Sequence, residues 1–265
     1  MDFTLSGDQL ELKQAAREWL SARFPLDRDW DAQDDRWAEV EELGWLDVAE
    51  AGLGFVEEAL LLEETGYVLY PGPFLAHVAG QTRALGVTFG GDGDVPSVDP
   101  TRPLRLPEGG WTSHETPRFR AACAAEALGI AQRALDLGVE HAKTREQFGK
   151  PIGTYQAVSH PLAQTYTDVE LARSLVYWAA WCVAEEDERA SLAAAAAKAF
   201  AAEAAVAACE RSIQVHGGIG FTWEHPLHRF YKRAIWLEGF GRRPPDLAGV
   251  DLNLDREADI CGLRR

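Results

Sequence analysis

The sequence predicts a mainly α-helical protein. Over long stretches, apolar residues recur at the spacing of one helix face, and these stretches end at proline or glycine. The segment 89–117 differs, because it holds five glycines and five prolines with few apolar runs, which is too little for a full β-domain. We therefore expect an N-terminal helical domain at 1–88, a shortened linker at 89–117 and a second helical domain at 118–265.

Four helices are expected in residues 1–88. Ser6 is a good N-cap for the first helix, and Pro25 ends it. Gly44 ends the second, and Pro71 and Pro73 precede the fourth. The last three helices are expected at about 34–43, 54–65 and 74–85.

Four longer helices are expected in the rest of the chain. Their apolar patterns cover about 118–144, 154–186, 189–215 and 226–240. Pro244 and Pro245 break the pattern, and the last 25 residues are interpreted as a tail.

Composition narrows the classes of partner and compartment. A net charge of −16 argues against nucleic acids and anionic membranes as partners. The four cysteines are far apart with no Cys-x-x-Cys pair, which favours reduced thiols in the cytoplasm over disulfides or a metal site. No signal peptide is expected. The apolar stretch at 192–209 contains Lys198 and Glu203, so we interpret it as a packed helix and not a membrane span.

The segment from Lys143 to Gln156 is the first candidate site. Arg145 follows a predicted helix, and its planar guanidinium group can pair with a diphosphate through two hydrogen bonds. Gly149 and Gly153 allow a turn and a close approach to a ligand, and Phe148 is suited to cover a ring. The alternative is an ordinary helix end, with a cation near its dipole and a glycine stop.

The segment from Gln214 to Gly220 is the second candidate site. Three glycines in four residues expose backbone amides that suit an anion. His216 is either a titrating group or, more commonly, a partner in a local hydrogen bond at the helix end. Taken alone, this segment is weak evidence for a ligand loop.

Together these segments resemble the acyl-CoA dehydrogenase family. The most specific matches are the run Arg145–Gly153 with Gln156, and the run Gln214–Phe221. Weaker matches, all in the N-terminal part, are Asp2–Ser6 with Gln9 and Leu10, Leu43–Leu46, Glu57–Glu58 and Glu63–Gly66. The resemblance covers both helical parts.

The resemblance implies a fold and a chemistry. The fold is an N-terminal helical domain, a middle β-domain and a C-terminal four-helix bundle. The cofactor is FAD and the substrate an acyl-CoA thioester, from which a glutamate removes the α-proton while the β-hydrogen leaves as hydride to the flavin. The residues carried over as contacts to FAD held mainly by a neighbouring subunit are Arg145, Phe148, Gln156, Gln214, Gly217 and Gly218.

Two departures from the family pattern matter. Residues 89–117 replace the middle domain and carry no recognisable flavin-contacting segment. At the aligned position of the catalytic glutamate the chain has Gly241, and the candidate base Glu238 lies three residues earlier, close to one helical turn. The alternative for Glu238 is a solvated carboxylate at a helix end.

The family's second base position offers no carboxylate either. It falls on Phe119 in this sequence. Glu126 lies nearby in an alanine-rich run and is either a buried base with a raised pKa or, as we favour, a partner in a salt bridge between helices.

With these two departures, the chain resembles the small subunits of certain family members in steroid side-chain degradation. Those enzymes are heterotetramers with two copies of each of two unlike subunits. The similarity extends over Gly218–His228. We therefore expect a subunit of an acyl-CoA dehydrogenase that shares its FAD site with an unlike partner, with a steroid or other bulky acyl-CoA as substrate. The alternatives are a non-catalytic structural or regulatory subunit, and a self-sufficient homo-oligomeric flavoenzyme with Glu238 as base.

Overall fold

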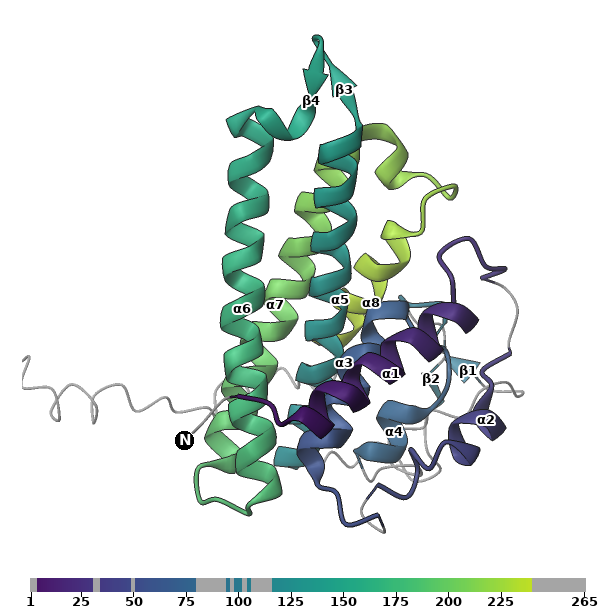
Figure 1. The fold of residues 1–265 in the computed structure, drawn as a ribbon, viewed down its shortest axis with the longest axis vertical. Helices are drawn as coiled ribbons and strands as arrows, with labels where there is room; N and C mark the ends of the chain where they lie inside the picture. The colour runs from purple at the N-terminus through teal and green to yellow at the C-terminus, as the bar shows by residue number, and fades with distance from the viewer. Residues whose placement is uncertain are drawn as a thin grey trace, which may run out of the picture.

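The computed structural model describes residues 4–30, 34–48, 51–79, 94–95, 98–101, 104–105 and 116–239. Within these ranges the chain is almost entirely helical, which confirms the predicted fold class. Figure 1 shows a bundle of long helices with a group of shorter helices against its lower half. Gly241 and the predicted tail lie outside the described residues.

The long helices form the expected four-helix bundle. They are α5 (Pro117–Thr144), α6 (Gln156–Ala184), α7 (Ala190–His216) and α8 (Leu227–Gly239). Each begins and ends within two residues of its predicted bounds. Successive helices run in opposite directions, so the α5–α6 connection and the end of α7 lie at the same end of the bundle, at the top of Figure 1.

Helix α7 is the alanine-rich core helix of the bundle. Ala193, Ala197, Ala201 and Ala205 are fully buried, and their spacing of four places them on one face. Among the described residues, Ala190–Phe221 is the one stretch long and apolar enough to cross a membrane, with 50% of its apolar window buried. The core helix of a soluble protein passes the same test, and here α7 packs against α5, α6 and α8.

The first helix of the N-terminal part follows its sequence signals closely. In α1 (Gly7–Arg23), the Ser6 hydroxyl accepts from the Gln9 N–H, while the Gln9 side chain accepts from the Ser6 N–H. This reciprocal capping box satisfies two amides that no helical carbonyl reaches. The predicted start at Ser6 is therefore confirmed, and the helix ends just before Pro25 as expected.

The next helices are shorter than predicted or buried on all sides. Helix α2 (Trp37–Glu42) begins three residues later than expected, because the carboxylates of Asp34 and Asp35 accept the backbone N–H groups of Arg36 and Trp37. Helix α3 (Phe55–Val68) is buried on almost every side. Helix α4 (Phe74–Val78) begins where predicted but ends at Val78, with Ala79 as its cap, and position 85, where its end was predicted, lies outside the described residues.

Helices α3 and α5 cross at two glycines. A Cβ on Gly66 would collide with the backbone carbonyl of Glu126, and a Cβ on Gly129 would collide with that of Glu63. The two backbones are therefore in direct contact, which only glycine permits. This crossing fixes the N-terminal part against the bundle.

The middle segment is a small remnant of sheet attached by a buried ion cluster. Strands β1 (Asp94–Val95) and β2 (Leu104–Arg105) pair antiparallel, Asp94 opposite Arg105. In the turn between them, the Asp99 carboxylate accepts from the fully buried Arg233 of α8. Arg233 also donates to Glu126 of α5 at 2.8 Å and to the Thr101 hydroxyl.

The ion cluster shows which of its two predicted roles Glu126 has. Its carboxylate is fully buried and paired with Arg233, which is the salt bridge between helices that we favoured. Burial alone would raise the pKa of Asp99, yet the adjacent Arg233 guanidinium holds that pKa below its usual value. The Asp99–Arg233 pair therefore stays ionised, and the cluster joins the middle segment, α5 and α8.

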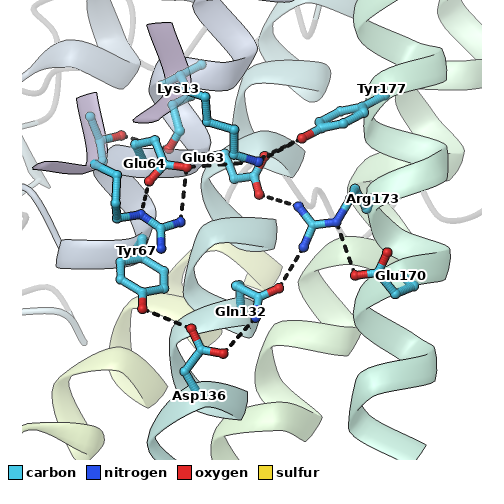
Figure 2. Close-up of polar contacts among 12 residues, drawn as sticks. Lys13, Glu63, Glu64, Tyr67, Gln132, Asp136, Glu170, Arg173 and Tyr177 are labelled. Atoms are coloured by element: carbon cyan, nitrogen blue, oxygen red, sulfur yellow. Dashed lines mark hydrogen bonds and ion pairs between the residues drawn. The ribbon is translucent and has the colours of Figure 1, made fainter. Parts of the chain in front are cut away.

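A second polar network joins the N-terminal helices to the bundle (Figure 2). The buried Glu63 of α3 accepts from Lys13 of α1 at 2.7 Å, from the Tyr177 hydroxyl at 2.9 Å and from Arg173, both of α6. Arg173 also donates to Gln132 of α5 at 2.6 Å. Burial raises the pKa of Glu63, but Lys13 and Arg173 outweigh it, and the net shift is downward. The glutamate is thus a structural anion that orients four helices.

Candidate cofactor site at one end of the bundle

The first candidate segment forms a tight hairpin at the end of α5. The Arg145 N–H donates to the His141 carbonyl at 2.8 Å and closes the helix. Strands β3 (Glu146–Gln147) and β4 (Lys150–Pro151) then pair antiparallel. The two residues between them, Phe148 and Gly149, have φ of 54° and 79°. Two successive positive φ values are what a two-residue hairpin turn needs.

Phe148 is unusual in this turn. A bulky residue at positive φ is strained, and its side chain is 92% exposed. Neither the backbone nor the burial of the ring therefore favours phenylalanine here. Strain combined with exposure of an apolar ring is typical of a functional position.

The hairpin returns the chain to its starting point. The Ile152 N–H donates to the Arg145 carbonyl at 2.8 Å, and the short 3₁₀ helix η1 (Ile152–Thr154) follows. A Cβ on Gly153 would lie 3.0 Å from the Ala142 carbonyl, so glycine is needed for this close approach to α5. Gln156 opens α6 and is exposed, as is Arg145.

The second candidate segment is the end of α7. The helix ends at His216, and Gly217 follows with φ of 66°. The 3₁₀ helix η2 (Gly217–Phe221) continues the chain. A Cβ on Gly217 or Gly218 would meet nothing within 4 Å, so the space beside this turn is open, while the Gly217 N–H donates to the carbonyls of Ile213 and Gln214 and closes the helix. Gln214 is exposed one turn earlier.

Histidines connect the two segments. The rings of His141, near the end of α5, and His216, at the end of α7, are stacked with centroids 4.2 Å apart. His216 also contacts the ring of His225 at 4.4 Å. The six residues predicted to contact the cofactor therefore come from segments gathered at one end of the bundle, at the top of Figure 1.

The candidate base lies elsewhere. Glu238 is half-buried near the end of α8, which runs away from that end of the bundle. Eleven residues separate it from Leu227, or about 16 Å of helix at 1.5 Å per residue. Phe119 is buried in the core at the opposite end of α5, and Glu126 is paired with Arg233. A carboxylate beside the two glycine segments is thus absent from the positions that the sequence suggested.

Sequence reasoning missed His141 and His225. Their contact with His216 forms only when three separate elements pack together, so no sequence pattern reveals it. A single histidine at a helix end is common and gives no signal by itself. In the described residues, no group of histidine, cysteine and carboxylate side chains is arranged to hold a metal ion.

Lowering the pH from about 7 to about 5 is expected to weaken the fold through these histidines. Burial, followed by the adjacent His216 and His141, lowers the pKa of His225 to about 4, and burial with His216 lowers the pKa of His141. In the unfolded chain these histidines have a pKa near 6.5 and bind more protons in this range than in the folded protein. The stability that their neutral forms give the fold is therefore present above about pH 6.5 and lost below it. Because the rings are partly exposed, the loss is about 1 kcal/mol.

Urea unfolding of the wild type and His225→Phe at both pH values measures this loss. The variant, which keeps an aromatic ring, is expected to lose less stability than the wild type on acidification. Equal losses in the two proteins would show that the histidine contacts do not carry the effect.

Comparisons with known proteins agree with this architecture. Residues 110–240 match the model of the acyl-CoA dehydrogenase C-terminal domain. IpdE2, an acyl-CoA dehydrogenase of Mycobacterium tuberculosis, is 41% identical over 146 residues, which cover 53% of this chain and 44% of IpdE2. FadE34 of the same organism is 48% identical over 152 residues, covering 53% of this chain and 21% of FadE34. The chain thus spans less than half the length of these relatives.

Two solved complexes share the fold over nearly the whole chain. A variant of the Tcur3481–Tcur3483 steroid ACAD superposes with a TM-score of 0.75 at 24% identity, covering 97% of this chain and 100% of that one. The ChsE4–ChsE5 complex of Mycobacterium tuberculosis superposes with a TM-score of 0.68 at 23% identity, covering 100% of both. FAD is the cofactor that belongs with the matched domain.

Proposed function

Because residues 110–240 belong to the acyl-CoA dehydrogenase family as its C-terminal domain, we propose that this chain is a subunit of an FAD-dependent acyl-CoA dehydrogenase. The enzyme introduces an α,β double bond into an acyl-CoA thioester. This chain contributes part of the FAD site at an interface with an unlike subunit. The assembly is a heterotetramer that works in the cytoplasm.

One observation carries the proposal. Arg145, Phe148, Gly217 and Gly218 are all exposed at one end of the bundle, and Phe148 is held there in a strained turn. Among the described residues no carboxylate pairs with Arg145, and nothing fills the space over the two glycines. A ligand shared with another chain accounts for both the exposure and the strain.

The residues present fit one end of a dinucleotide cofactor. The guanidinium of Arg145 suits the diphosphate, the open space beside the Gly217–Gly218 turn leaves room for it, and Phe148 offers a ring face. When bound, FAD supplies the acceptor for the hydride that leaves the β-carbon. The wall that excludes water from the flavin ring comes from the partner subunit, since the described middle segment is only a two-stranded remnant.

Glu238 is the proposed base on this chain. It lies near the end of α8, away from the two glycine segments. Supply of the base by the partner subunit is the competing arrangement. If the complex of the Glu238→Gln variant turns over as fast as the wild type, the base comes from the partner subunit. That result also removes the hypothesis of a self-sufficient homo-oligomeric enzyme.

The substrate is proposed to be a bulky acyl-CoA, such as a steroid ester. The similarity in fold to a steroid ACAD complex supports this. The second candidate function is a structural or regulatory subunit. The buried polar network around Glu63 joins the N-terminal helices to the bundle, which fits a scaffolding role.

Expression of the chain alone and with the dehydrogenase-like product of a neighbouring gene tests the shared site. We expect stoichiometric FAD and acyl-CoA oxidation in the co-purified complex only. An isolated chain that retains stoichiometric FAD and oxidises acyl-CoA would contradict the proposal.

Arg145→Ala separates a site role from a structural role. Loss of hydrogen bonds to a charged diphosphate costs about 1.5–3 kcal/mol, so FAD is expected to bind the complex roughly 10- to 100-fold more weakly. The control is Arg189→Ala, an exposed arginine paired with Asp187 at the start of α7. Full FAD occupancy and activity in Arg145→Ala would favour the structural subunit.

A further inference from the structure

Three imidazole rings form a column at the cofactor end of the bundle. His141 stacks on His216 with centroids 4.2 Å apart and planes 27° apart, and His216 contacts His225 at 4.4 Å. The column is adjacent to both candidate segments. The His141 carbonyl accepts the N–H of Arg145, and His216 directly precedes Gly217. The column is therefore adjacent to the groups proposed to face the ligand.

The charges around the column are positive. Arg145 of α5 faces His141, and His228 of α8 faces His225, with Arg229 and Lys232 next to His228. After burial, the groups that lower the pKa of His141 and of His225 are Arg145 and neighbouring histidines, while Glu140 and Glu224 adjoin the two rings in sequence. The local field thus opposes protonation of the rings and attracts an anion.

Hydrogen bonds decide which ring can gain a proton. Nδ1 of His216 lies 2.8 Å from the Ser212 carbonyl, which only accepts, so Nδ1 carries a hydrogen and Nε2 is the basic nitrogen. Nδ1 of His225 accepts the N–H of Leu227 at 3.2 Å and would lose that bond on protonation. Protonation of His225 would therefore break a hydrogen bond, whereas the bond from His216 to Ser212 is compatible with either form of the ring.

We propose that the His141–His216–His225 column is a positioning element that takes up a proton when a diphosphate binds between Arg145 and Gly217. The bound diphosphate supplies the negative charge that the site lacks and offsets the repulsion from Arg145. Cofactor binding and ring protonation then favour each other. The inference rests on the proposed function, which assigns the diphosphate of FAD to these residues.

Calorimetric titration of the flavin-free co-purified complex with ADP-ribose tests the coupling. This probe keeps both diphosphate charges between about pH 6 and pH 8, so a pH effect reports the protein. If binding raises the pKa of one imidazole by about one unit, the affinity for ADP-ribose is expected to be roughly fivefold higher at pH 6 than at pH 8. Titrations in two buffers with different heats of ionisation are expected to show net proton uptake.

Variants identify the source of the proton. His216→Phe keeps an aromatic ring in the column but cannot titrate, so the pH dependence and the proton uptake should fall. His77→Gln, on α4 far from the column, removes another histidine and should leave both unchanged. A purely structural role for His216 would lower affinity equally at both pH values.

The outcomes separate this inference from the proposed function. An affinity that is the same at pH 6 and pH 8, with no proton uptake, overturns the coupling while leaving the Arg145 site intact. The absence of ADP-ribose binding in the millimolar range also overturns it. The proposed function is judged separately, by FAD occupancy of the Arg145→Ala complex.

Discussion

Arg233→Ala is expected to lower the free energy of unfolding by about 3–5 kcal/mol, because it leaves two buried carboxylates without their cation. Asp99 and Glu126 are both almost fully buried, and Arg233 donates to each. Without the guanidinium, one or both carboxylates must be protonated or exposed. Helix α8 and the middle segment then lose their common attachment. Chemical denaturation of the wild type and the variant measures the effect.

A neutral version of the cluster is the control for this prediction. A triple variant, Arg233→Met with Asp99→Asn and Glu126→Gln, removes every charge and keeps similar volumes. Buried ion clusters replaced in this way often lose little stability, so most of the deficit of Arg233→Ala should be recovered. A triple variant as unstable as Arg233→Ala would mean that shape or hydrogen bonds, and not unpaired charge, hold this region together.

Gly129→Ala is expected to be the second most damaging change, at about 3 kcal/mol or more. In an ordinary helix, replacing glycine by alanine stabilises by about 1 kcal/mol. Here the new methyl group meets the backbone of α3 at Glu63, which cannot rotate aside as a side chain does. The helices must separate, and the core packing around them is lost.

Thermal and urea unfolding of Gly129→Ala checks both the sign and the size of this effect. Gly7→Ala is the matched control, since Gly7 opens α1 and a Cβ there meets nothing within 4 Å. The control should change stability by less than about 1 kcal/mol in either direction. A stabilised Gly129→Ala would mean that α3 and α5 are not in backbone contact in solution.

Local signals in the sequence predicted most helix boundaries. The capping box at Ser6, the stop before Pro25 and the glycine after His216 each act within one helical turn, so their physics is present in the sequence itself. Prediction was less accurate at α2, where two adjacent aspartates bind the backbone in a way that competes with a helix.

The candidate site could be predicted only in part. Arg145 and Gly217 were found because an arginine and a glycine-rich turn at the ends of long helices, when both occur in one chain, are typical of a site for a phosphate group. Their common location depends on the antiparallel course of α5, α6 and α7. The histidine column was not predictable, since its members lie 75 and 9 residues apart along the chain.

By itself, the sequence determined that the protein is helical and where most of its long helices begin and end, and it predicted two segments that offer groups for an anion. These properties arise from interactions between residues a few positions apart. Only the tertiary structure decided that Glu126 is a salt-bridge partner, that Gly129 is a contact between backbones, and that three histidines meet beside Arg145. Those outcomes depend on burial and on neighbours distant in sequence, which exist only once the helices have packed.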